Sequence, residues 1–333
     1  MKKPPFHDRG QRSQISLLHA HAREFLYQWG WPHDAKVTCV NHGFNTTFRV
    51  QAEGRPEAAL RLNVNSAKTL AEVEGETSFV SHLSQSGLLV PQPLASPDGS
   101  YVLERDWEGP KPLKAVLYTW LKGRRYNSRF AVKDGFELGC LTTRLHEAAS
   151  YWKIPARVKV RLAGDPLGGL PWVMEDQQGM GIDLGLWKEV LARTHSLYAG
   201  IESWPRTVIH DDLHMWNLMK VKQGMAVFDF DDMVLGWPIR DAAVTLFYIR
   251  RLKDAEAVEA AYWRGLGLTL DEAGLTKAQF ELMVGARVLL LANDLAQNAT
   301  AELRAELPGY VGKADKRLRR LLDDGVYLPL DSD

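Results

Sequence analysis

The residues whose types and spacing most directly suggest chemistry lie between positions 208 and 232. The stretch 208–218 reads VIHDDLHMWNL, and the stretch 227–232 reads VFDFDD. Phosphoryl transfer needs a carboxylate that orients the attacking hydroxyl and accepts its proton, together with oxygen ligands for magnesium on the nucleotide phosphates. Asp212 can supply the carboxylate, and Asn217 and Asp229 can supply the ligands. These residues therefore favour transfer of a nucleotide phosphate to a hydroxyl group.

A β-hairpin has to bring the two ligands together. Strand-like residues on both sides of a turn at 222–224 predict a hairpin over 217–230. Asn217 and Asp229 then lie at the open ends of its two strands. The apolar neighbours of Asp229 favour a buried carboxylate over a solvated acidic turn.

The N-terminal part of the chain predicts a β-sheet that can present a cation. Short strands are expected at 37–40, 46–51, 58–64, 100–104 and 114–120. Side chains alternate between the two faces of a strand, so Ala59 and Arg61 share one face of the third strand. Arg61 can then reach the phosphates of a nucleotide.

Glu76 belongs to the apolar stripe of a helix expected over 67–85. It follows Val73 by three residues and precedes Val80 by four, so its carboxylate is expected to face inward. A buried carboxylate needs a partner. We therefore predict an ion pair between Glu76 and Arg61, and a partly exposed Glu76 is the alternative.

Length and composition restrict the class of protein. The 333 residues suit two lobes, and 41 basic residues balance 41 acidic ones. Zero net charge argues against a protein that coats nucleic acid or anionic membranes. The two cysteines form no CxxC pair, and neither a signal peptide nor a transmembrane segment is expected. We expect a cytoplasmic protein that binds a small molecule, with its oligomeric state left open.

The order of the expected elements predicts an α+β fold with two lobes. Residues 1–118 would form a small N-lobe with a helix at 14–29 and five antiparallel strands, with one helix inserted after the third. Residues 119–333 would form a larger, mainly α-helical C-lobe that contains the hairpin. Its helices are expected at 128–150, 185–200 and through most of 241–322.

The motifs of the C-lobe resemble those of the aminoglycoside phosphotransferase and choline kinase-like family, which has the protein-kinase fold. The matching residues are His210-x-Asp212-Leu213-His214-x-x-Asn217, then Phe228-Asp229-Phe230-Asp231, then Gly236 and Asp241-Ala242. Asp211 departs from the family, which usually has Gly there, and Met215-Trp216 replaces a common Pro-Gly.

This resemblance implies roles for the matching positions. Asp212 would be the catalytic base, Asn217 and Asp229 would hold Mg²⁺, His210 would brace the catalytic loop, and Asp241 would support that loop from below. ATP would be the phosphate donor, with GTP not excluded because the hinge recognises the base largely through backbone groups. The residues that would bind the nucleotide are Gly43, Asn45, Ala59, Arg61, Glu76, and the hinge residues Thr119 and Leu121.

Three other interpretations stay open on the sequence. An HxDxH run at His210, Asp212 and His214 suits transition metals in a hydrolase, although this leaves Asn217 and Asp229 without a role. The chain could also be a Ser/Thr protein kinase of the bacterial stress-response type. A catalytically silent nucleotide-binding regulator of the same fold is the third.

Overall fold

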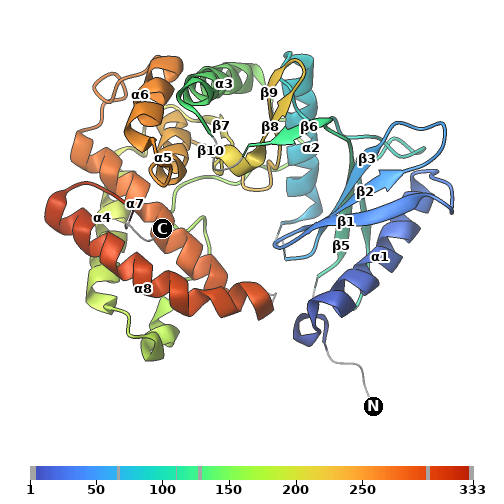
Figure 1. Ribbon diagram of the computed structural model, residues 1–333, viewed down its shortest axis with the longest axis horizontal. Helices are drawn as coiled ribbons and strands as arrows, with labels where there is room; N and C mark the ends of the chain where they lie inside the picture. Colours follow the sequence, from blue (N-terminus) through green and yellow to red (C-terminus); the bar gives the residue numbers. More distant parts are fainter. Residues whose placement is uncertain (1–4, 66–67, 110, 127–129, 298–300, 330–333) are drawn as a thin grey trace. The chain divides into compact units, whose positions relative to one another are not determined.

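The chain folds into two compact units. The computed structural model describes residues 5–65, 68–109, 111–126, 130–297 and 301–329 (Figure 1). Unit 1 comprises Met1–Lys122, Lys153–Lys159 and Asn298–Ala305, and unit 2 comprises Gly123–Trp152, Val160–Gln297 and Glu306–Asp333. The boundary expected after residue 118 falls within unit 1, because Thr119 still pairs with Ala58.

Unit 1 is built on one five-stranded antiparallel sheet with the strand order β1-β2-β3-β5-β4. The helix α2, Leu70–Gln85, is inserted after the third strand, so the predicted sheet with one inserted helix is confirmed. The strands are β1 Lys36–His42, β2 Thr46–Gln51, β3 Ala58–Asn63, β4 Val102–Arg105 and β5 Leu113–Thr119.

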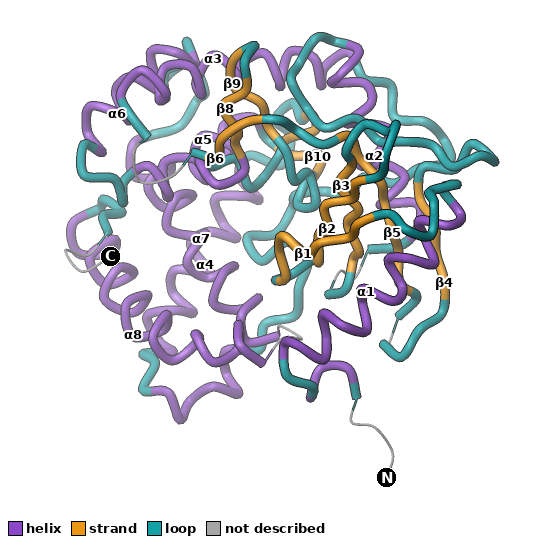
Figure 2. Tube along the Cα trace, turned by 45° about the vertical axis from the view of Figure 1, so that its right-hand side comes forward, coloured by secondary structure: helices purple, strands orange, loops and turns teal. Residues whose placement is uncertain are grey.

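The first helix, α1 (Gln11–Gln28), packs along β1, β2 and β3 (Figures 1 and 2). Leu18 and Phe25 project from it into the same buried cluster as Phe48 and Leu60 of the sheet. All four side chains are fully buried. This apolar contact covers one face of the sheet.

The helix α2 begins at a capping box. The Thr69 hydroxyl accepts a hydrogen bond from the backbone N–H of Glu72, and the Glu72 carboxylate accepts one from the Thr69 N–H. A side chain at Gly75 would collide with the backbone oxygen of Lys159, so glycine lets the segment 153–159 lie against the helix. The expected start of this helix at residue 67 lies outside the described residues.

Unit 2 is mainly helical, which confirms the predicted fold class. Glycines at 139 and 265 let α3 and α6 pack backbone to backbone, because a Cβ at either would meet the other helix. No helix in the described ranges is long and apolar enough to cross a membrane. The helices are α3 Val132–Tyr151, α4 Leu184–Gly200, α5 Pro238–Ile249, α6 Ala255–Leu266, α7 Lys277–Gln297 and α8 Ala301–Asp324, the first residues of which group with unit 1.

Short strands frame the predicted hairpin of unit 2. β8 (Leu218–Val221) and β9 (Gly224–Val227) form the hairpin, and β6 (Gly123–Arg125) extends it on the side of β8. β7 (Thr207–Ile209) pairs with β10 (Val234–Gly236). The predicted catalytic loop, residues 210–217, runs from β7 to β8, and the loop that carries Asp229 runs from β9 to β10.

Candidate functional site

Asp241 organises the backbone at the start of the catalytic loop. It is fully buried in α5, and its carboxylate accepts hydrogen bonds from the N–H groups of His210 (3.1 Å) and Asp211 (2.7 Å). Nε2 of His146 on α3 lies 2.8 Å from the same carboxylate. Burial raises the pKa of Asp241, but its contacts with His146 and His210 outweigh burial and hold it below the usual value. An ionised carboxylate can thus fix two successive peptide groups.

The His210 ring links the catalytic loop to the loop after the hairpin. Its Nδ1 accepts a hydrogen bond from the N–H of Asp212 at 3.3 Å, which leaves Nε2 to donate to the carbonyl of Phe228 at 3.1 Å. Burial lowers the pKa of His210, so the neutral ring that this pattern requires is favoured. His210 therefore braces the loop through its side chain as well as its backbone.

The carboxylate of Asp212 is held from both sides. Its Oδ2 accepts from the Asn217 amide at 2.8 Å and lies 3.1 Å from Nε2 of His214, while Oδ1 contacts Nη2 of Arg287 on α7. Burial acts to raise the pKa of Asp212, but His214 and Arg287 outweigh burial and lower it. Asp212 is therefore ionised at neutral pH, as a base that accepts a proton must be.

Asn217 and Asp229 form a pair of oxygen groups suited to magnesium. The Asn217 amide nitrogen faces Asp212, and its side-chain oxygen accepts no hydrogen bond from the described residues. The N–H of Phe228 donates to the carbonyl of Asn217 at 3.0 Å, which places Asp229 next to Asn217 across the hairpin end. Nowhere in the described ranges do three His, Cys, Asp or Glu side chains gather as a metal site. Magnesium is typically bound by one or two protein side chains, and phosphate oxygens and water complete its coordination shell. The pair Asn217 and Asp229 fits that pattern.

Asp211 occupies a backbone conformation that favours glycine. Its φ is +61°, which costs a non-glycine residue about 1–2 kcal/mol. Its carboxylate forms two hydrogen bonds to Arg240 on α5, Nε to Oδ1 at 2.6 Å and Nη2 to Oδ2 at 2.8 Å. Both side chains are buried. The ion pair with Arg240 therefore offsets the backbone strain of Asp211.

We expect Asp211→Gly to destabilise the protein although glycine suits the backbone. The substitution relieves the strain but leaves Arg240 buried without its carboxylate, and such a loss typically costs about 3–5 kcal/mol. Urea unfolding should show a net loss of about 1–4 kcal/mol in the free energy of unfolding. The double variant Asp211→Gly/Arg240→Leu should regain most of it, and a single variant as stable as the original chain would contradict the argument.

In unit 1, the Arg61–Glu76 ion pair that the helical phase indicated is present. Arg61 on β3 approaches both oxygens of Glu76, at 2.7 and 2.8 Å. The Tyr118 hydroxyl donates to Glu76 at 3.0 Å, and Nζ of Lys68 lies 3.6 Å away from it. Glu76 is 1% exposed. The register of β3 is therefore the one in which Arg61 shares a face with Ala59 and turns towards α2.

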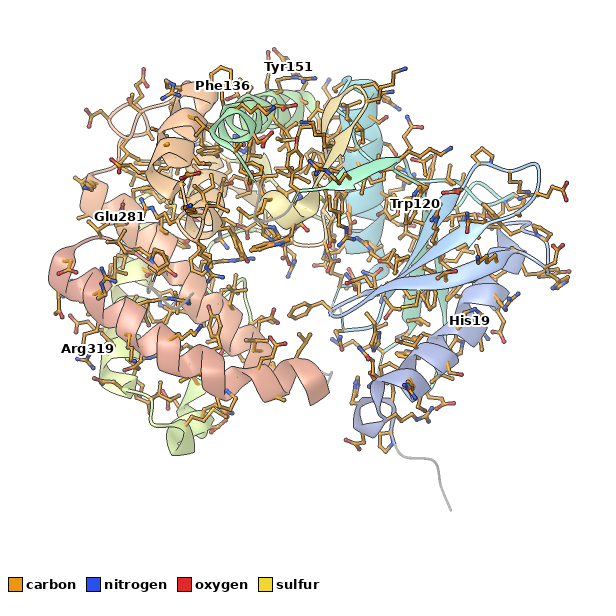
Figure 3. All side chains as sticks on the ribbon, viewed as in Figure 1. His19, Trp120, Phe136, Tyr151, Glu281 and Arg319 are labelled. Carbon is orange, nitrogen blue, oxygen red and sulfur yellow. The ribbon has the colours of Figure 1, made fainter. Side chains whose placement is uncertain are left out.

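The remaining nucleotide candidates lie on loops and strand ends of unit 1. Gly43 and Asn45 form the tight turn between β1 and β2, closed by a 3.1 Å hydrogen bond from the Gly43 N–H to the Asn45 carbonyl. The N–H of Thr119 donates to Gln92, whereas that of Leu121 makes no hydrogen bond within the described chain. As far as the described residues go, the N–H of Leu121 is therefore available as a donor. Trp120, labelled in Figure 3, lies between Thr119 and Leu121. The guanidinium carbon of Arg49 lies over its ring, 5.0 Å from the ring centre.

The sequence analysis gave no role to several side chains that contact the candidate residues of each unit. His214 and Arg287 contact the Asp212 carboxylate, and Tyr118 contacts Glu76. Arg287 left one signal, because it is the single charge in the otherwise uncharged run 282–293. Asp294 lies two turns further along α7, and burial, followed by the charge of Asp232, raises its pKa to about 7.

The sequence matches a known protein family and a relative in another organism. A model of the phosphotransferase enzyme family (APH) matches residues 36–280. A relative from Deinococcus radiodurans, described as an uncharacterized protein, is 29% identical over 284 residues, which cover 82% of this chain and 80% of the relative.

Two solved structures share the fold. A microcompartment-associated aminopropanol kinase superposes with a TM-score of 0.75 at 20% identity, covering 93% of this chain and 99% of that one. Amicoumacin kinase hAmiN, in complex with AMP-PNP, Ca²⁺ and Ami, gives a TM-score of 0.69 at 19% identity, covering 94% and 98%. At these identities the likeness concerns the fold.

Proposed function

Because the chain belongs to the phosphotransferase enzyme family, we propose that it transfers the γ-phosphate of ATP to a hydroxyl group of a small molecule. The observation that carries this proposal is the Asp212 carboxylate, which is ionised, only partly covered and fixed by hydrogen bonds. A base so held is prepared to orient an acceptor hydroxyl before transfer.

In the proposed reaction, Asp212 accepts the proton of the acceptor hydroxyl. The acceptor oxygen forms a bond to the γ-phosphorus, and the bond from that phosphorus to the β–γ bridging oxygen breaks. Its electron pair stays on ADP. Asp241 and His210 contribute by fixing the loop, because a base displaced by 1 Å can lose about 10² in rate.

Asn217 and Asp229 are the residues that would hold magnesium. When bound, the ion neutralises charge on the phosphates. The Asn217 amide nitrogen is turned to Asp212, so its oxygen is the atom left for a hard cation. The same amide therefore ties the position of the base to that of the metal ligand.

We assign the nucleotide to residues of unit 1 on the following grounds. Glu76 orients Arg61, a permanent cation with a forked set of donors that suits phosphate oxygens. Gly43 and Asn45 would cover the phosphates, Ala59 would lie beside the adenine, and Thr119 and Leu121 would contact its edge. We also propose a cytoplasmic location, which suits an ATP-dependent enzyme whose two cysteines are both free thiols.

The acceptor in this proposal is a small hydroxyl compound. The fold relatives named above are kinases of aminopropanol and of amicoumacin. A screen of hydroxylated metabolites, from amino alcohols to sugars and aminoglycosides, by ADP release is the direct way to find it. Phosphorylation of casein but of no small molecule would instead favour a protein kinase.

We expect ATP binding to depend on magnesium. Calorimetric titration should show at least tenfold weaker binding of ATP when EDTA replaces magnesium, because Asn217 and Asp229 act on the phosphates through the ion. Asp229→Asn should weaken binding with magnesium and change it little without. Tight binding that is indifferent to the metal would remove the case for these two ligands.

A further inference from the structure

Arg287 is a buried cation with partners in and beside the catalytic loop. It lies on α7 within unit 2 and is 7% exposed. Its Nη2 contacts Oδ1 of Asp212 and lies 3.5 Å from the Tyr248 hydroxyl, while Nη1 donates to the carbonyl of Asp211 at 3.2 Å. Its guanidinium also lies over the Tyr248 ring, 5.9 Å from its centre. The third donor group, Nε, is buried and has no hydrogen-bond partner within the described chain.

The hydrogen bonds of Asp212 distinguish its two oxygens. A carboxylate oxygen has about two lone-pair sites. Oδ2 already receives the Asn217 amide and Nε2 of His214, which carries the proton because Nδ1 accepts from the Trp216 N–H. Among the described residues, Oδ1 receives Arg287 alone. Oδ1 is therefore the oxygen with a site left for an acceptor hydroxyl.

We propose that Arg287 is a positioning residue that presents Oδ1 of Asp212 to the acceptor hydroxyl. The inference rests on the proposed function, since it concerns the base of that reaction. The proton of the acceptor moves to Oδ1 while the acceptor oxygen bonds to the γ-phosphorus and ADP leaves. Arg287 fixes the direction of the free lone pair on Oδ1, so the acceptor hydroxyl approaches from the side of α7.

A second buried arginine of unit 2 shows what a purely structural role looks like. Arg250, at the end of α5, is 9% exposed and makes two hydrogen bonds each to Glu259 and to Glu281 of α7, the latter labelled in Figure 3. Its fifth bond goes to the carbonyl of Tyr327. Arg250 joins helices and makes no contact with the catalytic loop. Among the described residues, Arg287 forms an ion pair with one carboxylate, and that carboxylate is the proposed base.

The first measurement needs no turnover. Urea unfolding midpoints are compared for Arg287→Met, Asp212→Asn and the double variant. Because the two groups pair in a buried site, each single change removes the same contact, and the double variant should unfold at a higher urea concentration than the sum of the single shifts predicts. Additive shifts would overturn the proposal.

The second measurement separates positioning from mere packing. ADP release from magnesium-ATP is followed with 1-amino-2-propanol, or with water alone, as the acceptor. Arg287→Met should lower kcat by about 10²-fold with the KM for ATP unchanged. Arg287→Lys should keep part of the kcat that Arg287→Met loses. Millimolar methylguanidine should raise the kcat of Arg287→Met but not that of Asp212→Asn.

The matched control is Arg250→Lys, which should keep kcat within about twofold although it weakens a buried ion pair. A folded Arg287→Met with the kcat of the original chain, or a loss that neither lysine nor methylguanidine reduces, would overturn the positioning role. Absence of ADP release from the unaltered chain with every acceptor in the screen would overturn the proposed function itself, and the positioning role with it.

Discussion

Asp212→Asn should abolish most turnover while ATP affinity stays nearly unchanged. The amide cannot accept the acceptor proton, and loss of a general base typically costs about 10²–10⁴ in rate. The contacts of Asp212 are with Asn217, His214 and Arg287, all in unit 2, so the substitution does not alter Arg61, the proposed phosphate contact in unit 1. Steady-state ADP release measures the turnover, and calorimetric titration with magnesium-ATP measures the affinity for ATP.

The control for this prediction is Asp294→Asn. Asp294 is a second carboxyl group whose surroundings include the charges of Asp212 and Arg287. It lies on α7 and forms no hydrogen bond or ion pair with the described residues, so its loss should leave kcat within about tenfold. A fully active Asp212→Asn would show that another group is the base, whereas equal losses in both variants would indicate a general electrostatic effect.

Arg61 and Glu76 should behave as one unit in turnover. Glu76→Ala leaves the buried Arg61 without its orienting carboxylate, and Arg61→Ala removes the proposed phosphate contact itself. Each single change should lower kcat/KM for ATP by about 10²-fold, and the double change should cost little more than either alone. A double-mutant cycle on ADP release measures the coupling between them.

The matched control pair is Arg49 on β2 and Glu57, the residue before β3, which form a second ion pair within unit 1. Arg49 donates to both oxygens of Glu57, but its side chain is 38% exposed. Exposed pairs contribute about 0–1 kcal/mol, so its single and double variants should be nearly silent in turnover. Losses at Arg61 and Glu76 that simply add in the double variant would contradict a joint role.

The sequence alone determined the features that depend on local pattern. The alternation of side chains in β3 and the helical phase of α2 predicted the Arg61–Glu76 pair, which is present. The turn residues at 222–224 predicted the hairpin that brings Asn217 and Asp229 together. Motif spacing in the catalytic loop predicted the family, which is confirmed. The roles of the site residues in nucleotide binding and catalysis stay predictions.

Only the tertiary structure decided which distant side chains complete the site. Arg287 follows Asp212 by 75 positions, and Arg240 follows Asp211 by 29. No periodicity within a helix tells which buried cation meets which carboxylate, because that depends on how helices pack and which residues face the same point. Asp211 illustrates the limit, because the sequence shows an unusual residue at a glycine position, whereas its compensation by Arg240 requires α5 to be in place.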